Sequence, residues 1–121
     1  MSEPKPIAKG SICHVEVPAP DIEKMQAFYG TVFGWTLTPM GQGYVLFSAG
    51  ETGGGLDPMM PVAEGGAVLV LAVDDIDASL ADIAANGGKG LSPKTEIGEG
   101  HGSYAYFRDP CGNKMGVWSK D

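Results

Sequence analysis

The sequence predicts an α+β domain made of two pseudo-symmetric βαβββ modules. Three observations support this prediction. Strand-like and helix-like hydrophobic periods alternate along the 121 residues, an aspartate precedes each helix-like segment, and the order of segments in the first half recurs in the second. The length suits one hydrophobic core. We therefore expect a single domain over residues 1–121, with one module at about 11–58 and the other at about 66–119.

The first half of the chain reads as a strand, a helix and three further strands. Residues 11–17 have the pattern of a strand, and Asp21 is a favourable N-cap for the helix that follows. Strands are expected over 35–40, 43–49 and about 53–57, with glycine-rich turns between them. The predicted helix face consists of Ile22, Met25, Phe28, Val32 and Phe33.

The second half repeats this order after a linker over 58–65. Residues 68–73 predict a strand, Asp75 is an N-cap, and Asn86-Gly87-Gly88 ends the helix. The predicted helix face consists of Ile76, Leu80, Ile83 and Ala84. Three more strands are expected, over 89–91, 103–107 and 113–118.

The two halves also align residue by residue. Residues 14–23 match 68–77 without a gap, an offset of 54, and Gly34 then pairs with Gly88. Residues 44–47 match 104–107 at an offset of 60, so one loop is longer in the second half. This shared order of elements predicts an internal duplication.

Four segments make the chain resemble a known superfamily. They are His14–Val17, "AFYGTVFGW" (Ala27–Trp35), Val73–Asp77 and "YFRDPCGNKMGVW" (Tyr106–Trp118). With them the chain resembles the vicinal-oxygen-chelate superfamily, which includes glyoxalase I, extradiol dioxygenases, and bleomycin- and fosfomycin-resistance proteins. Three shorter stretches are most similar to a glyoxalase-like subgroup of unknown activity: "VFGW", "PKTEIGEGHGSYAYF" and "GVW". The resemblance implies helices outside a curled mixed sheet that encloses a cavity, and a homodimer.

Strand alternation sorts the side chains into two faces. On the first strand Val15 and Val17 should lie under the helix, while His14 and Glu16 point into the cavity. Residues 68–73 are apolar on both faces, so we expect both faces to be covered. The same reasoning assigns a largely aromatic ligand pocket, typical of a small-molecule site. Its residues are Tyr44, Leu46, Met59, Val68, Tyr104, Tyr106, Gly116 and Trp118. The alternative for the tyrosines and tryptophan is a purely structural role in the core.

The resemblance implies a divalent metal held by side chains of the first and last strands. The matching positions here are His14 and Val68 on the first strands, and Gly55 and Gly116 on the last. Valine and glycine side chains cannot coordinate a metal, and one imidazole rarely holds one against water. We therefore expect a degenerate metal site and no cofactor.

Alternatives to this expectation remain open at the sequence level. Glu16, with Glu99 or His101 from a glycine-rich loop, would give His14 the ligands for a rebuilt metal site. Without a metal, His14 and Glu16 are candidates for catalysis as a general base with an orienting carboxylate. A further alternative is that His14 is a structural histidine whose hydrogen bonds are satisfied within the protein.

Three functions follow from these residues. The leading hypothesis is metal-independent binding of a small molecule between the modules. The second is a metal-dependent or His14-based lyase, isomerase or dioxygenase-type enzyme. The third is resistance by sequestration, because a cationic drug of the bleomycin type would suit an acidic protein.

Charge and cysteine content exclude other classes. The formal net charge is −7, which repels phosphate backbones and anionic lipid, so we expect no nucleic-acid or membrane partner. No apolar run is long enough to span a membrane, and residues 1–10 lack a signal-peptide pattern, so we expect a cytoplasmic protein. Cys13 and Cys111 fit no metal-binding spacing, and we expect free thiols.

Overall fold

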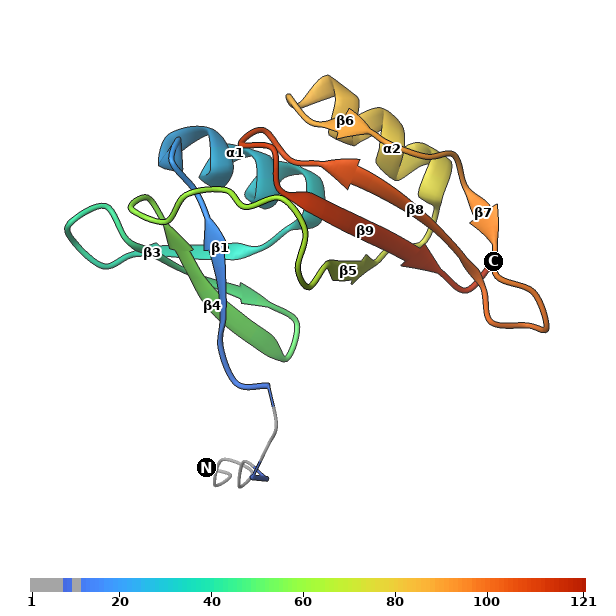
Figure 1. The fold of residues 1–121 in the computed structure, drawn as a ribbon, viewed down its shortest axis with the longest axis horizontal. Helices are drawn as coiled ribbons and strands as arrows, with labels where there is room; N and C mark the ends of the chain where they lie inside the picture. The colour runs from blue at the N-terminus through green and yellow to red at the C-terminus, as the bar shows by residue number, and fades with distance from the viewer. Residues whose placement is uncertain (1–7, 10–11) are drawn as a thin grey trace.

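A computed structural model gives the fold of this chain and describes residues 8–9 and 12–121. The first half forms a four-stranded sheet in the order β1-β4-β3-β2, with β1 parallel to β4 and the other neighbours antiparallel (Figure 1). Its elements are β1 (Val15–Pro18), α1 (Ile22–Phe33), β2 (Thr36–Pro39), β3 (Val45–Ala49) and β4 (Thr52–Asp57).

The second half repeats this topology in a five-stranded sheet. The strand order is β5-β9-β8-β6, β7 also pairs with β8, and β5 runs parallel to β9 as β1 does to β4. Its elements are β5 (Leu69–Ala72), α2 (Ile76–Ala85), β6 (Lys89–Gly90), β7 (Thr95–Glu96), β8 (Ser103–Arg108) and β9 (Lys114–Ser119). The predicted α+β class with two βαβββ units is confirmed.

Two details of the strands differ from the prediction. The first strand begins at Val15, whereas it was expected from residue 11; residues 12–14 form no strand, and Ser11 lies outside the described residues. Strand β7 was not predicted, because two residues among glycines leave no readable period.

Both helices begin and end as the sequence predicts. The Asp21 carboxylate accepts a hydrogen bond from the Lys24 amide at 3.2 Å, and Asp75 accepts one from the Ala78 amide at 3.0 Å. Each carboxylate satisfies a free amide of the first turn, which explains the preference for aspartate there. Gly34 ends α1 with φ 69°, a conformation that glycine adopts without a side-chain penalty. No helix in the described residues is long and apolar enough to cross a membrane.

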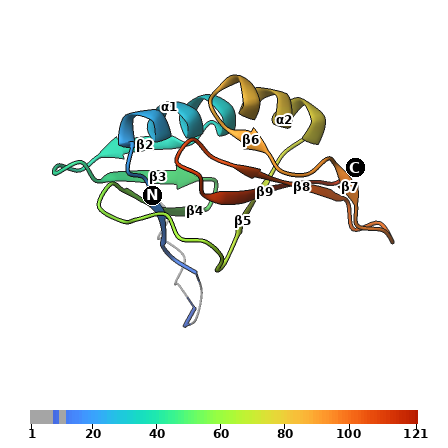
Figure 2. The same ribbon diagram turned by 45° about the horizontal axis from the view of Figure 1, so that its top comes forward.

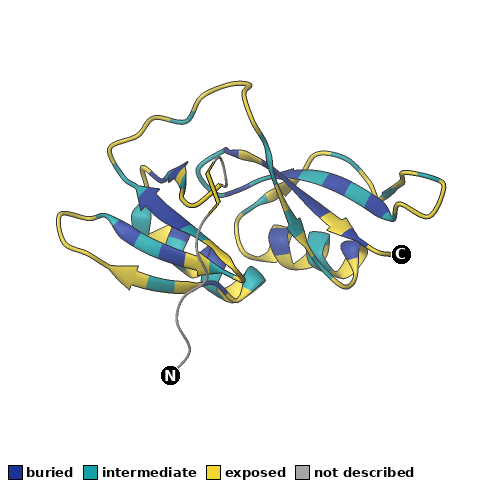
Figure 3. Ribbon diagram, turned by 90° about the horizontal axis from the view of Figure 1, so that it is seen from below, coloured by how far each residue is buried: buried dark blue, intermediate teal, exposed yellow. Residues whose placement is uncertain are grey.

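The two helices lie on the same side of the sheets, and the opposite side is open (Figures 2 and 3). The sheets lie side by side and do not close into a barrel, so the enclosed cavity expected from the sequence is not formed by this chain. The expectation that both faces of the strand over 68–73 are covered is wrong for the same reason. Val70 on the open face of β5 is 53% exposed, while Leu69 and Leu71 on the helix side pack against the core.

An aromatic core joins the two modules. Trp35 stacks between Tyr29 and Phe47, with ring centroids 4.2 and 4.3 Å away. Phe107 of β8 in turn packs against Phe33 of α1 at 5.8 Å. Helix α1 therefore packs against both sheets. These side chains are at least half-buried, so separating the modules would expose a large apolar area.

A buried polar network reinforces the same junction. The Asp109 carboxylate, 3% exposed, accepts hydrogen bonds from the Tyr29 hydroxyl at 2.9 Å and the Asn113 amide group at 2.8 Å. The Asn113 side chain also donates to the Pro18 carbonyl at 2.8 Å. Desolvation raises the pKa of Asp109, although these hydrogen bonds oppose the rise. The network fixes β1 against the turn between β8 and β9.

Candidate functional site

His14 and Tyr44 meet on the open face of the first sheet. Tyr44 precedes β3, and its Oη lies 3.1 Å from His14 Nε2. The Tyr44 ring rests over Gly55 of β4, where a Cβ atom would approach Oη to 1.8 Å. Glycine at 55 therefore makes the room that the Tyr44 ring occupies, and the ring brings a phenol to the histidine.

The surroundings of Tyr44 favour the protonated form of its hydroxyl. Desolvation raises the pKa of Tyr44, and the negative charges of Glu16 and Asp57 raise it further. A neutral phenol can donate its proton to an unprotonated ring nitrogen, so Tyr44 fits His14 as a hydrogen-bond donor. Glu16 is exposed on the same face, and its register partner is Gly55.

The predicted aromatic residues of the second sheet form a separate cluster. Tyr104 and Tyr106 pack edge to face with ring centroids 5.5 Å apart, and Trp118 is the register partner of Tyr104. The Trp118 indole donates to the His101 carbonyl at 2.9 Å, which holds the ring against the loop between β7 and β8. The Lys114 ammonium lies 4.4 Å from the centre of the Tyr106 ring. These side chains lie on the open face of the sheet, as strand alternation predicts.

The residues at the implied metal positions do not fit a metal. Val68 and Gly116 offer no donor atom, and the space next to Gly55 is filled by Tyr44. Among the described residues no group of three or more His, Cys, Asp or Glu side chains is placed to hold a metal ion. Among the described residues, His14 has the Tyr44 hydroxyl as its hydrogen-bond partner at this place.

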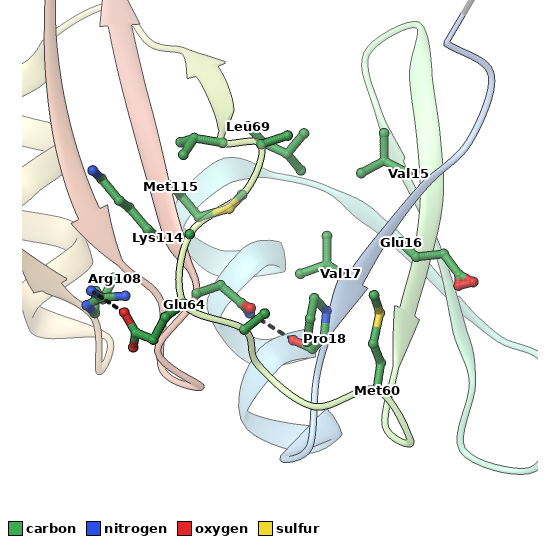
Figure 4. Close-up of a pocket in the computed structure, with 15 residues that line it drawn as sticks. Val15, Glu16, Val17, Pro18, Met60, Glu64, Leu69, Arg108, Lys114 and Met115 are labelled. Carbon is green, nitrogen blue, oxygen red and sulfur yellow. Dashed lines mark hydrogen bonds and ion pairs between the residues drawn. The ribbon is translucent and has the colours of Figure 1, made fainter.

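A cleft of about 450 Å³ lies between the modules (Figure 4). Val15 and Val17 of β1 form one wall, and Leu69 of β5 and Met115 of β9 form the other. The linker between β4 and β5 passes along it with Met60, Ala63, Glu64, Gly65, Ala67 and Val68. Charged side chains stand at the rim: Glu16 on the first module, Arg108 and Lys114 on the second, and Glu64 on the linker.

A second, more apolar cleft adjoins the first. It measures about 490 Å³ and shares Val15 and Leu69 with the first. Its other residues include Phe33, Trp35 and Phe47, and none of the described residues that line it is charged. A groove with apolar walls therefore runs between β1 and β5, with its polar groups gathered at the end beneath the linker.

The structure divides the predicted site residues among four places. Glu16 and Val68 line the charged cleft; Tyr44 and Met59 line a separate depression with Met40 and Asp57. Leu46 shares the open face of the first sheet with His14, and the remaining four residues lie on that of the second. These four are Tyr104, Tyr106, Gly116 and Trp118.

Sequence reasoning did not single out Arg108, Lys114, Asn113 or Glu64. A signal for two of them was present, because strand alternation places Arg108 on the face of Tyr106 and Lys114 on the face of Gly116. Glu64 lies in the linker, where no period predicts the direction of a side chain.

Comparisons with known proteins agree with this architecture. Residues 11–117 match the family described as Glyoxalase/Bleomycin resistance protein/Dioxygenase superfamily. A "Glyoxylase-like domain-containing protein" of Didymella fabae is 27% identical and aligns over 94% of this chain and 97% of its own. The "Putative glyoxylase CFP32" of Mycobacterium bovis is 30% identical over 86% of this chain, which spans only 43% of that protein.

Solved structures share the fold. A glyoxalase/bleomycin resistance protein/dioxygenase family enzyme from Burkholderia phytofirmans superposes with a TM-score of 0.75 at 19% identity, covering 93% of this chain and 100% of that one. The fosfomycin resistance protein FosX from Listeria monocytogenes gives a TM-score of 0.73 at 15% identity, covering 93% and 94%. Because the family match spans nearly all the described elements, the chain belongs to the glyoxalase/bleomycin resistance protein/dioxygenase superfamily.

Proposed function

We propose that this protein binds a small organic molecule in the cleft between its two modules, without a divalent metal. The observation behind the proposal is the cleft of about 450 Å³ with apolar walls and a charged rim. Small-molecule sites fall in this range of volume and combine apolar walls with a few polar groups. The cleft also lies where elements of both modules meet, which is a common place for ligands.

The metal-free part of the proposal is supported by the side chains at the implied ligand positions. Val68 and Gly116 cannot coordinate, and a carboxylate at position 55 would collide with Tyr44. We expect no stoichiometric binding in calorimetric titrations with Ni²⁺, Zn²⁺, Mn²⁺ or Fe²⁺. An ion that binds stoichiometrically and is lost in His14→Ala would contradict this part.

The binding site itself can be tested with a matched pair of variants. Ala67 lines the cleft and Ala81 lies exposed on α2, so Ala67→Trp fills the cleft while Ala81→Trp adds the same bulk elsewhere. A fragment library screened by amide NMR should shift the signals of Val17, Leu69 and Met115. These shifts should disappear in Ala67→Trp and persist in Ala81→Trp. Fragments that bind only elsewhere, or equally to both variants, would refute the site.

A second candidate function is acid–base catalysis at His14. It is favoured by the 3.1 Å contact between His14 Nε2 and the Tyr44 hydroxyl, because a neighbouring phenol can orient an imidazole and relay a proton. Once a substrate is found, turnover should be lost in His14→Ala with folding intact. Turnover unchanged in His14→Ala would remove this candidate.

The homodimer implied by the resemblance is also a proposal. The open face of the two sheets, which includes the exposed Val70 and Trp118, offers apolar surface for a second copy. Sedimentation velocity at several protein concentrations would distinguish a dimer from a monomer.

A further inference from the structure

Three of the chain's eight lysine and arginine residues stand in a row across the second sheet. The strand register pairs Lys89 of β6 with Arg108 of β8, and Arg108 with Lys114 of β9. Register partners point to the same face of a sheet, so the three side chains are neighbours. Like charges directly opposite each other destabilise a sheet. In a chain of net charge −7, this row is a local concentration of positive charge.

The end of the row reaches the cleft between the modules. Arg108 and Lys114 both line its rim, on the side formed by β8 and β9 (Figure 4). Glu16 lies across the cleft, with its carboxylate directed away from them over the first sheet (Figure 4). The cleft therefore has one cationic rim next to the apolar wall of Leu69 and Met115.

The Arg108 guanidinium is fixed on one side and weakly engaged on the other. Nη1 donates to the Gly112 carbonyl at 2.9 Å. Nη2 has a carboxylate oxygen of Glu64 at 3.7 Å, beyond hydrogen-bond distance, and the Glu64 side chain is 88% exposed. Such an exposed pair contributes little free energy, so a competing anion can displace Glu64 at low cost. Lys114 is engaged by the Tyr106 ring and likewise keeps its ammonium available.

We propose that this cationic rim selects ligands with a carboxylate, whose apolar body lies along the wall of the cleft. The planar guanidinium matches a carboxylate, and a charge-assisted hydrogen bond to Nη2 would replace the long contact with Glu64. Glu64 on the linker then acts as a weak internal competitor for the same place. This inference rests on the proposed small-molecule cleft and adds the chemical class of its ligand.

A pair of probes that differ only in charge tests this selection. We would titrate 2-naphthoate and the isosteric 2-naphthamide into the protein and follow the amide signals of the cleft by NMR. The carboxylate should bind about tenfold more tightly than the amide. Lys114→Gln should reduce this preference without changing the affinity for the amide, because Arg108 remains. Glu64→Gln should strengthen carboxylate binding about two- to fivefold.

Lys24→Gln on α1 is the matched control, because it removes the same charge from an exposed helix position outside the cleft. Arg108 is left intact, since its side chain also supports the turn between β8 and β9. Equal affinities for the two probes, unchanged in Lys114→Gln and Glu64→Gln, would overturn the carboxylate selection and leave the proposed cleft standing. Failure of both probes to shift any cleft signal would overturn the cleft and the selection together.

Discussion

Gly54 and Gly55 are neighbours in β4, but alanine at each position should lower the free energy of unfolding by a different amount. At Gly54 the added Cβ would lie 1.8 Å from the Val15 carbonyl oxygen and 2.8 Å from Cζ of Phe47. The first atom is backbone of the adjacent parallel strand, so relief requires moving β1 away from β4. Overpacking costs roughly 1–3 kcal/mol and each weakened ladder hydrogen bond about 1 kcal/mol. We expect Gly54→Ala to lower the free energy of unfolding by about 3 kcal/mol.

At Gly55 the added Cβ meets the far end of one side chain. It would lie 1.8 Å from Oη of Tyr44 and 2.1 Å from Cζ, and this half-buried ring can rotate outward. The change loses the hydrogen bond to His14, but alanine has less backbone entropy to lose than glycine, which offsets about 0.5–1 kcal/mol. We therefore expect Gly55→Ala to cost less than about 1 kcal/mol.

Urea unfolding followed by tryptophan fluorescence measures both variants. The nitrogen chemical shift of His14 Nε2 adds a local readout, because Gly55→Ala should reproduce the shift produced by Tyr44→Phe, which removes the same hydroxyl. Equal losses of stability in the two alanine variants would refute the close approach of β1 to Gly54. A His14 signal in Gly55→Ala that matches wild type would refute the placement of Tyr44.

Two further predictions concern the buried network. Tyr29→Phe removes a hydrogen bond to the Asp109 carboxylate. We expect it to lower the free energy of unfolding, measured in urea, by about 1.5–3 kcal/mol. A loss under about 0.5 kcal/mol would argue against the hydrogen bond. Desolvation, then the Asp109 charge, raises the pKa of Tyr29 well above its ordinary value near 10. The stabilising contribution of Tyr29 is therefore complete below about pH 10 and is lost as pH rises toward the folded pKa. The difference in the free energy of unfolding between wild type and Tyr29→Phe should therefore become smaller above about pH 10. A difference that stays constant with pH would contradict this prediction.

Local signals identified most of the fold. The aspartates before α1 and α2 predicted both helix starts, because an N-cap satisfies amides of the adjacent turn only. Strand alternation placed Val17 under the helix and Tyr104 on the open face, since the period of two depends on the backbone alone. The short strand β7 was beyond this reasoning, because it forms only by pairing with β8.

The candidate site was predictable in part. The loss of donor atoms at Val68 and Gly116 is a property of residue identity, so the sequence alone excluded them as metal ligands. The contact between His14 and Tyr44 was not predictable, because it joins residues 30 positions apart and depends on the room above Gly55.

The sequence by itself determined the duplicated βαβββ order, the helix ends, the faces of the strands and the residue types at the implied metal positions. Each of these depends on residue type and on neighbours a few positions away. The tertiary structure decided that the sheets lie side by side, that Tyr44 covers Gly55, and that Arg108 and Glu64 share the rim of one cleft. The position of Tyr44 depends on contacts within the first sheet between residues far apart in the sequence. The other two features depend on packing between the modules, where α1, Phe107 and the Asp109 network set the distance and direction that local patterns leave free.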